Sequence, residues 1–159
     1  MGVLYGALAW ASLDKAAKVR AGQMIAIISA KYGVVRPLDE IEPYKQEINR
    51  AAMREGVSAH LSAIKTDLII DCRSSTYKGV WAPPHHNCVE IKVFTLVDGV
   101  KKVITHMSKK SRGELRRLLL ESPTIPTNPR ELQIIVSSVL ECHLIPAGEN
   151  EPWTLEVIC

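Results

Sequence analysis

The sequence contains no apolar run long enough to cross a membrane. A membrane-spanning helix needs roughly 18 or more consecutive apolar residues, and no segment of the 159-residue chain approaches that length. The first ten residues have no basic lead-in and no apolar stretch followed by a small-residue cleavage site, which together mark a secretory signal. We therefore expect a cytoplasmic protein with no membrane partner.

Paired cysteines are also missing. The chain has four cysteines, and none forms a Cys-x-x-Cys pair, so reduced thiols are expected and the spacing typical of zinc sites is absent. His85, His86 and Cys88 come nearest to a ligand set, but their spacing does not suit a tetrahedral site. They are interpreted as exposed loop histidines beside a core cysteine, with no metal and no cofactor.

The signatures of common catalytic sites do not occur. There is no Ser-His-Asp order, no nucleophile elbow and no glycine-rich dinucleotide loop, so no catalytic residue can be specified and the interpretation leans away from an enzyme. No repeat or low-complexity tract divides the chain. Because a chain of this length can bury roughly 70% of its unfolded surface, a single domain over residues 1–159 is expected.

Local patterns predict an α/β (mixed α+β) fold, a single domain with a mixed sheet and flanking helices. Short apolar runs suit buried strands. Predicted strands at 89–97 and 100–107 flank Asp98-Gly99, a dipeptide that favours a type I′ turn, so an antiparallel hairpin is expected over 89–107. The other predicted strands span 24–29, 68–71, 142–145 and 153–158. The predicted helices span 14–20, with Gly22 as a stop, 45–54, 109–121, and 129–139, with Asn128 as the cap and Pro129 at the first position.

Basic charge is concentrated in one segment. The net charge is only +3, but Lys101 to Arg117 holds seven basic residues and a single acid, Glu114. Such a local excess indicates an anionic partner. If the helix begins at Lys109, Lys109 and Lys110 oppose its dipole, a cost that a bound anion offsets. The alternative is a solvated basic face.

Two loops could add to an anion site. The segment Ser29–Lys45 follows the first predicted buried strand, at the position where ligands of open α/β sheets bind, and Arg73–Lys78 follows the second. Both combine cations with tyrosines and hydroxyl groups, although each could equally be a self-satisfied loop or a capped turn. The candidate nucleic-acid- or phosphate-binding residues are Ser29, Tyr32, Arg36, Tyr44, Lys45, Arg73, Ser74, Tyr77, Lys78, Lys109, Lys110, Arg112 and Arg116.

The segment Ser29–Tyr44 resembles the most recognisable stretch of the YaaA family, Ser-(Ala/Gly)-x-Tyr-Gly-x-x-Arg-Pro-Leu-Asp-x-Ile-x-Pro-Tyr. Met107–Gly113, MSKKSRG, is similar to the family's Tyr-Ala-Lys-Lys-Ala-Arg-Gly. A looser similarity covers Ile70–Tyr77, and Lys45 stands where the family usually has arginine. Members of this family are known as cytosolic proteins that protect cells from hydrogen peroxide by limiting free iron, and as binders of double-stranded DNA with a positively charged cleft.

The resemblance therefore implies a peroxide-stress protein that binds double-stranded DNA in a basic cleft built from the two loops and the basic helix. Met1 falls where family members are already well inside the domain, so the chain is expected to lack the family's N-terminal segment. A sheet edge or apolar face left without that segment is expected to be covered in a homo-oligomer. The alternatives are an enzyme acting on a nucleotide or phosphorylated small molecule, with Tyr32 and Tyr44 flanking the base, and a purely structural role.

Overall fold

The structure, a computed structural model, describes residues 8–40, 42 and 45–159. The chain divides into two compact units, which are considered separately. The first unit holds the described residues up to Leu13, then Asp67–Cys72 and Pro84–Cys159, and the second holds Asp14–Thr66 and Arg73–Pro83. The expectation of one domain over the whole chain stays a prediction.

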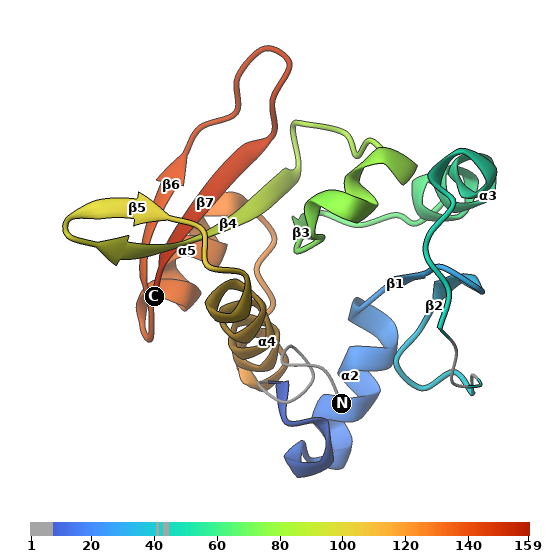
Figure 1. Cartoon of the computed structure of the whole chain (residues 1–159). Helices are drawn as coiled ribbons and strands as arrows, with labels where there is room; N and C mark the ends of the chain where they lie inside the picture. The colour runs from blue at the N-terminus through green and yellow to red at the C-terminus, as the bar shows by residue number, and fades with distance from the viewer. Residues whose placement is uncertain (1–7, 41, 43–44) are drawn as a thin grey trace. The chain divides into compact units, whose positions relative to one another are not determined.

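The first unit is built on a mixed sheet with the strand order β3-β4-β7-β6, and β5 pairs with β4 (Figure 1). β4 runs parallel to β3 and β7, whereas β6 is antiparallel to β7 and β5 is antiparallel to β4. This confirms the predicted mixed α/β class. The elements of the unit are η1 (Trp10–Ser12), β3 (Ile69–Asp71), β4 (Cys88–Val97), β5 (Val100–Lys102), α4 (Thr105–Glu121), α5 (Pro129–Ser137), β6 (Glu141–Ile145) and β7 (Trp153–Ile158).

The core of this unit lies between the sheet and helices α4 and α5. Alternate residues of β4 point to the same face of the sheet, and Val89, Ile91 and Val93 are all buried there. They join one apolar cluster with residues such as Leu115 of α4 and Leu132 of α5, so both helices pack on this face. The strands predicted for 142–145 and 153–158 are confirmed as β6 and β7.

The hairpin that leads into α4 is partly as predicted. Asp98 and Gly99 have φ values of 52° and 76°, as a type I′ turn requires. However, β5 ends at Lys102 and α4 begins at Thr105, so the strand predicted for 100–107 and the helix start predicted at Lys109 are wrong. The helix begins earlier because its buried stripe extends from Leu115 back to Ser108, whose N–H donates to the carbonyl oxygen of Ile104 at 2.8 Å.

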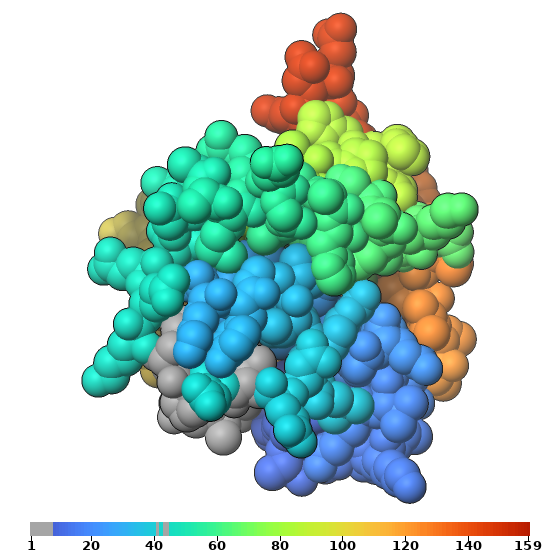
Figure 2. Space-filling model, turned by 90° about the vertical axis from the view of Figure 1, so that its right-hand side faces the viewer, coloured from blue at the N-terminus to red at the C-terminus, as the bar shows by residue number. Residues whose placement is uncertain are grey.

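The second unit contains a separate two-stranded sheet. β1 (Ile27–Ser29) pairs antiparallel with β2 (Gly33–Val35), so the prediction of a strand at 24–29 buried on both faces is wrong. A three-residue strand with one partner leaves Ile27 and Ile28 half-buried. Figure 2 shows the face on which this hairpin, coloured blue, lies beside α3 (Arg50–Ser62), coloured teal. The unit also contains α2 (Lys15–Met24) and η2 (Ser75–Val80).

Both helices of the second unit that precede β3 differ from the prediction. α2 continues past Gly22 to Met24, so the prediction that Gly22 ends the helix is wrong. A Cβ atom at Gly22 would lie 3.1 Å from the side chain of Leu38, so the glycine lets Leu38 pack closely against α2. α3 begins later than the predicted residue 45, since the side chain of Asn49 caps it by accepting from the N–H of Ala52 at 3.1 Å. The helix then continues through Gly56 without a break.

Within the part of the chain that the structure describes, no helix is both long enough and apolar enough to cross a membrane.

Candidate functional site

The cations of α4 fall into two groups. Lys110 and Arg117 each have an acid one helical turn later: Lys110 Nζ lies 3.8 Å from Glu114 Oε1, and Arg117 Nη2 lies 2.8 Å from Glu121 Oε1. Arg117 also donates to the carbonyl oxygen of Leu8 at 3.0 Å, which ties the helix to the described N-terminal residues. These two positive charges are balanced locally.

Arg112 and Arg116 have only neutral hydrogen-bond partners. Arg112 Nη1 donates to Ser108 Oγ at 2.7 Å and its Nη2 donates to the carbonyl oxygen of Ile91 at 3.5 Å. Arg116 Nη2 donates to the carbonyl oxygen of Cys72 at 3.4 Å. Nε of Arg112 is buried without a partner. Among residues 8–40, 42 and 45–159 no acid lies within ion-pair distance of either guanidinium. Neither charge is therefore directly paired, although the carboxylates of Asp71 and Glu90 act on Arg112 from further away.

Burial makes this excess charge costly. It is the main cause that lowers the pKa of Arg112, and repulsion from Arg116 lowers it further, whereas Cys72 and the carboxylates of Asp71 and Glu90 act in the opposite direction. A guanidinium whose charged form is disfavoured by its surroundings gains from an added anion. The face of α4 that carries Arg112 and Arg116 is therefore suited to hold a phosphate or another oxyanion.

Lys109 lies one turn before Arg112 and is exposed. Because α4 begins at Thr105, its first turn ends at Ser108 and Lys109 begins the second. The argument that Lys109 and Lys110 oppose the dipole from the first turn is therefore wrong, since the dipole acts within that turn. An anion on α4 is instead favoured by Arg112 and Arg116, which have no direct ion-pair partner among the described residues.

The predicted loop after β1 is held together largely by its own residues. Ser29 is 3% exposed, and its hydroxyl accepts from the backbone N–H of Lys31 at 3.3 Å and of Tyr32 at 3.1 Å. The guanidinium of Arg36 donates to the carbonyl oxygen of Ile25 at 3.1 Å, at the end of α2. Ser29 and Tyr32 thus share one ordered turn, whereas Arg36 ties the chain after β2 to the end of α2. Tyr44 lies outside the described residues, and Lys45 is exposed.

The second predicted loop, Arg73–Lys78, leads into and mostly forms the short helix η2. Arg73 Nη1 donates to the carbonyl oxygens of Tyr77 at 3.2 Å and Trp81 at 2.9 Å, and its guanidinium lies 5.7 Å from the centre of the Trp81 ring. These contacts show that Arg73 holds η2 and the residue after it in place. Ser74 is exposed at the start of η2, whereas Tyr77 and Lys78 are half-buried.

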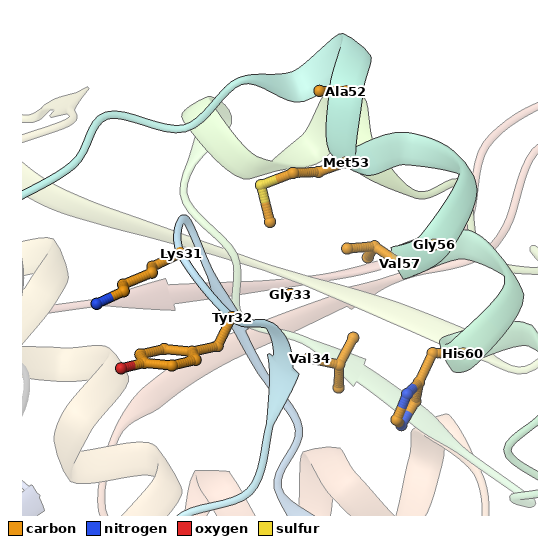
Figure 3. Close-up of a pocket in the computed structure, with 9 residues that line it drawn as sticks. All are labelled: Lys31, Tyr32, Gly33, Val34, Ala52, Met53, Gly56, Val57 and His60. Carbon is orange, nitrogen blue, oxygen red and sulfur yellow. The ribbon is translucent and has the colours of Figure 1, made fainter. Parts of the chain in front are cut away.

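A hollow that the sequence did not predict lies in the second unit, between α3 and the turn after β1 (Figure 3). Its volume is about 410 Å³. Of the predicted residues only Tyr32 lines it. A sequence signal was present, because Ala52, Gly56 and His60 recur every fourth residue and so share one helix face with little side-chain bulk in its middle. The lining residues are Lys31, Tyr32, Gly33, Val34, Ala52, Met53, Gly56, Val57 and His60.

The predicted site residues therefore form three groups. Lys109, Arg112 and Arg116 share one side of α4 in the first unit, and the loop after β1 and the segment Arg73–Lys78 belong to the second unit. That all three build a single basic cleft stays a prediction.

The residues nearest to a metal-ligand set are placed as the sequence indicated. His85 and His86 are exposed, and Cys88 is fully buried in the first unit. Within the described ranges, no three side chains of histidine, cysteine, aspartate or glutamate gather as a metal site would require. That no metal or cofactor binds stays a prediction.

Fold and site together define an α/β protein with a cationic helix, two of whose guanidinium groups have no direct ion pair among the described residues. A sequence model of the family described as "Peroxide stress protein YaaA" matches residues 1–135, and the chain belongs to this family. A UPF0246 protein of Streptomyces coelicolor is 31% identical over 174 residues, which cover 99% of this chain and 65% of the relative. A UPF0246 protein of Corynebacterium efficiens is 33% identical, with 98% of this chain and 66% of the relative covered.

A third relative, a UPF0246 protein of Roseobacter denitrificans, is 30% identical over 143 residues, which cover 76% of this chain and 54% of that protein. The chain thus matches between 54% and 66% of the length of these three relatives.

Proposed function

We propose that this chain is a cytoplasmic protein of the peroxide-stress response that binds double-stranded DNA through phosphate contacts from α4 and helps to limit free iron. Membership of the YaaA family supports the link to peroxide stress. The iron-limiting part rests on the family resemblance alone. The DNA-binding part has support from the structure of α4, which can be tested separately.

The observation that carries the DNA proposal is the charge pattern of α4. Lys110 and Arg117 are each paired with an acid one turn away, whereas Arg112 and Arg116 have hydroxyl, carbonyl and thiol partners and no direct ion pair. If the cations served solubility alone, an acid one turn from each of them would stabilise the helix. Two guanidinium groups without a direct ion pair suit an external anion, and DNA carries closely spaced phosphates.

The spacing of the cations suits such a row. Lys109 and Arg116 are seven residues apart, which is roughly 10 Å along a helix axis. A DNA duplex carries about one phosphate per 1.7 Å of its axis when both strands are counted. Lys109, Arg112 and Arg116 can therefore contact more than one phosphate at once. Such contacts provide affinity without reading the base sequence.

Salt dependence of duplex binding tests this proposal. We expect the variant Lys109→Gln/Arg116→Gln to flatten the slope of log K against log salt concentration by about 1.8, because each phosphate contact contributes about 0.9. Binding should weaken equally for unrelated duplex sequences. Fluorescence anisotropy with two unrelated 20-base-pair duplexes, titrated at several salt concentrations, measures both quantities.

A control variant removes the same charge elsewhere. Lys15 of α2 and Lys65 are exposed and belong to the second unit. Lys15→Gln/Lys65→Gln lowers the net charge by the same two units, yet we expect the slope to keep its original value. Equal slopes in the two double variants would show that α4 does not contact the phosphates, and absence of any duplex binding would refute the proposal itself.

A further inference from the structure

The hollow of the second unit has two walls that lack side chains. Gly33 lies in the turn after β1, and Gly56 lies midway along α3. A Cβ atom added at either position would have no other atom within 4 Å. Neither glycine therefore adds a side chain to the hollow, here called the slot, and a flat group can approach the backbone closely at both positions (Figure 3).

The two glycines differ in backbone conformation. Gly33 has a φ of 79°, a conformation that favours glycine whatever surrounds it. Gly56 has no positive φ and no close neighbour, and it occupies the interior of a helix, where glycine is one of the least favourable residues. Neither backbone conformation nor packing accounts for glycine at this position. Close approach of a ligand does account for it.

The floor of the slot is apolar. Val34 of β2 and Met53 and Val57 of α3 point towards one another across it (Figure 3), and they belong to the small core cluster of this unit. Flat rings pack well against aliphatic and thioether groups, because the methionine sulfur is polarisable and adapts to the shape of the ring. The floor thus favours an unsaturated ring over a charged or strongly hydrated group.

Polar groups stand at the two ends of the slot. Lys31 and Tyr32 lie side by side at one end, with Lys31 Nζ 5.2 Å from the centre of the Tyr32 ring, and His60 lies at the other (Figure 3). Among the described residues, no ion pair involves Lys31 or His60. Lys31 is thus available to an anion, and the imidazole of His60 can donate or accept a hydrogen bond.

We propose that this hollow binds a single unpaired nucleotide, with its base against the open backbone of the lining glycines, its phosphate at Lys31 and the polar edge of its base at His60. A flat ring with an anion at one end and hydrogen-bonding groups at the other is the shape that the slot and its ends fit. The hollow, of about 410 Å³, is largely open to solvent, so part of the bound nucleotide stays exposed. The proposal rests on the nucleic-acid function proposed above and adds a second, independent subsite to it.

Two neighbouring alanines of α3 provide a matched test. Ala51 and Ala52 are both exposed, but only Ala52 lines the hollow. The full chain is titrated by calorimetry with adenosine monophosphate and with a single-stranded oligo(dA) of eight nucleotides. We expect Ala52→Leu to weaken binding by about tenfold, which is the loss that one stacked base represents, and Ala51→Leu to bind as the original chain does.

A second variant separates binding from folding. Gly56→Ala adds a methyl group to open space and improves helix propensity, so we expect a higher melting temperature together with weaker nucleotide binding. A glycine without a role in binding would give the stability gain alone. Unchanged affinity in Gly56→Ala, or equal affinities in Ala51→Leu and Ala52→Leu, would overturn the proposal.

The two ligands distinguish the source of the nucleotide. Binding of the monophosphate indicates a free nucleotide, whereas binding of the oligonucleotide alone indicates an unpaired base within a strand. Binding of neither would refute this subsite. The duplex-binding slope of Ala52→Leu should equal that of the original chain, so failure of the nucleotide site and failure of duplex binding on α4 are separate results.

Discussion

Cys72 directly follows β3, and its carbonyl oxygen accepts a hydrogen bond from Arg116. Burial, the largest cause, raises the pKa of its thiol above the ordinary 9.0, although the charges of Arg116 and Arg112 act to lower it. The thiolate is the reactive form of cysteine, so this thiol is expected to be inert near neutral pH. At the scale of single residues, the cation pair thus sits beside a protonated thiol instead of a thiolate.

The raised pKa of Cys72 predicts a loss of stability in alkaline solution. Above pH 9.0 the unfolded chain releases this proton while the folded chain still holds it, so the free energy of unfolding falls as pH rises. Urea unfolding at pH 8 and pH 10 measures the fall, and Cys72→Ser should reduce it because serine does not titrate there. Burial also raises the pKa of Cys142, so part of the fall should remain. An identical fall in Cys72→Ser and the original chain would contradict this assignment.

At the scale of elements, α5 shows how a cap defines a helix. The side chain of Asn128 accepts from the N–H of Glu131 at 2.9 Å, and Pro129 occupies the first helical position. Asn128→Ala should lower the free energy of unfolding by about 1 kcal/mol, measured by urea denaturation. Asn128→Ser keeps a capping oxygen and should retain most of the stability. If both variants lost the same amount, the cap would not be the cause.

Elements with a strong local signal could be predicted from the sequence. Asp98-Gly99 and Asn128-Pro129 specify a turn and a helix start through the chemistry of two residues, and both were confirmed. β1 could not be predicted correctly, because an apolar run does not reveal whether its strand has one partner or two. Gly22 and Gly56 show the same limit, since only the surrounding structure distinguishes a glycine that ends a helix from one that permits close approach.

The candidate site was predictable only in part for a related reason. The basic residues of α4 could be read from the sequence, but their pairing depends on where the helix begins and on which acids lie one turn away. The roles of Arg36 and Arg73 in holding their own loops depend on carbonyl groups that the sequence does not place. The hollow beside α3 needs the β1–β2 turn as its second wall, which no pattern within the helix indicates.

At the scale of the whole molecule, the two units differ in the size of their buried side chains. The first unit buries large residues such as Ile91, Leu115 and Leu155. Among the described residues of the second unit, the buried apolar side chains are mainly alanine and valine, with Leu61 as the largest. We expect backbone amides of α3 to exchange with solvent deuterium faster than those of β4 and β7, because less apolar burial opposes local opening. Equal protection in native-state hydrogen exchange would contradict this.

The chain passes between the two units four times, at residues 13–14, 66–67, 72–73 and 83–84. The second unit is thus composed of two separate stretches, and the first unit of three. Neither unit corresponds to one uninterrupted piece of the gene, so neither can be expressed alone by choosing a start and a stop codon. A chain truncated within 73–83 would lose part of the second unit. It would also lose strands β4 to β7 of the first unit. A chimera of two relatives joined at a single point would therefore mix residues of both parents within at least one unit.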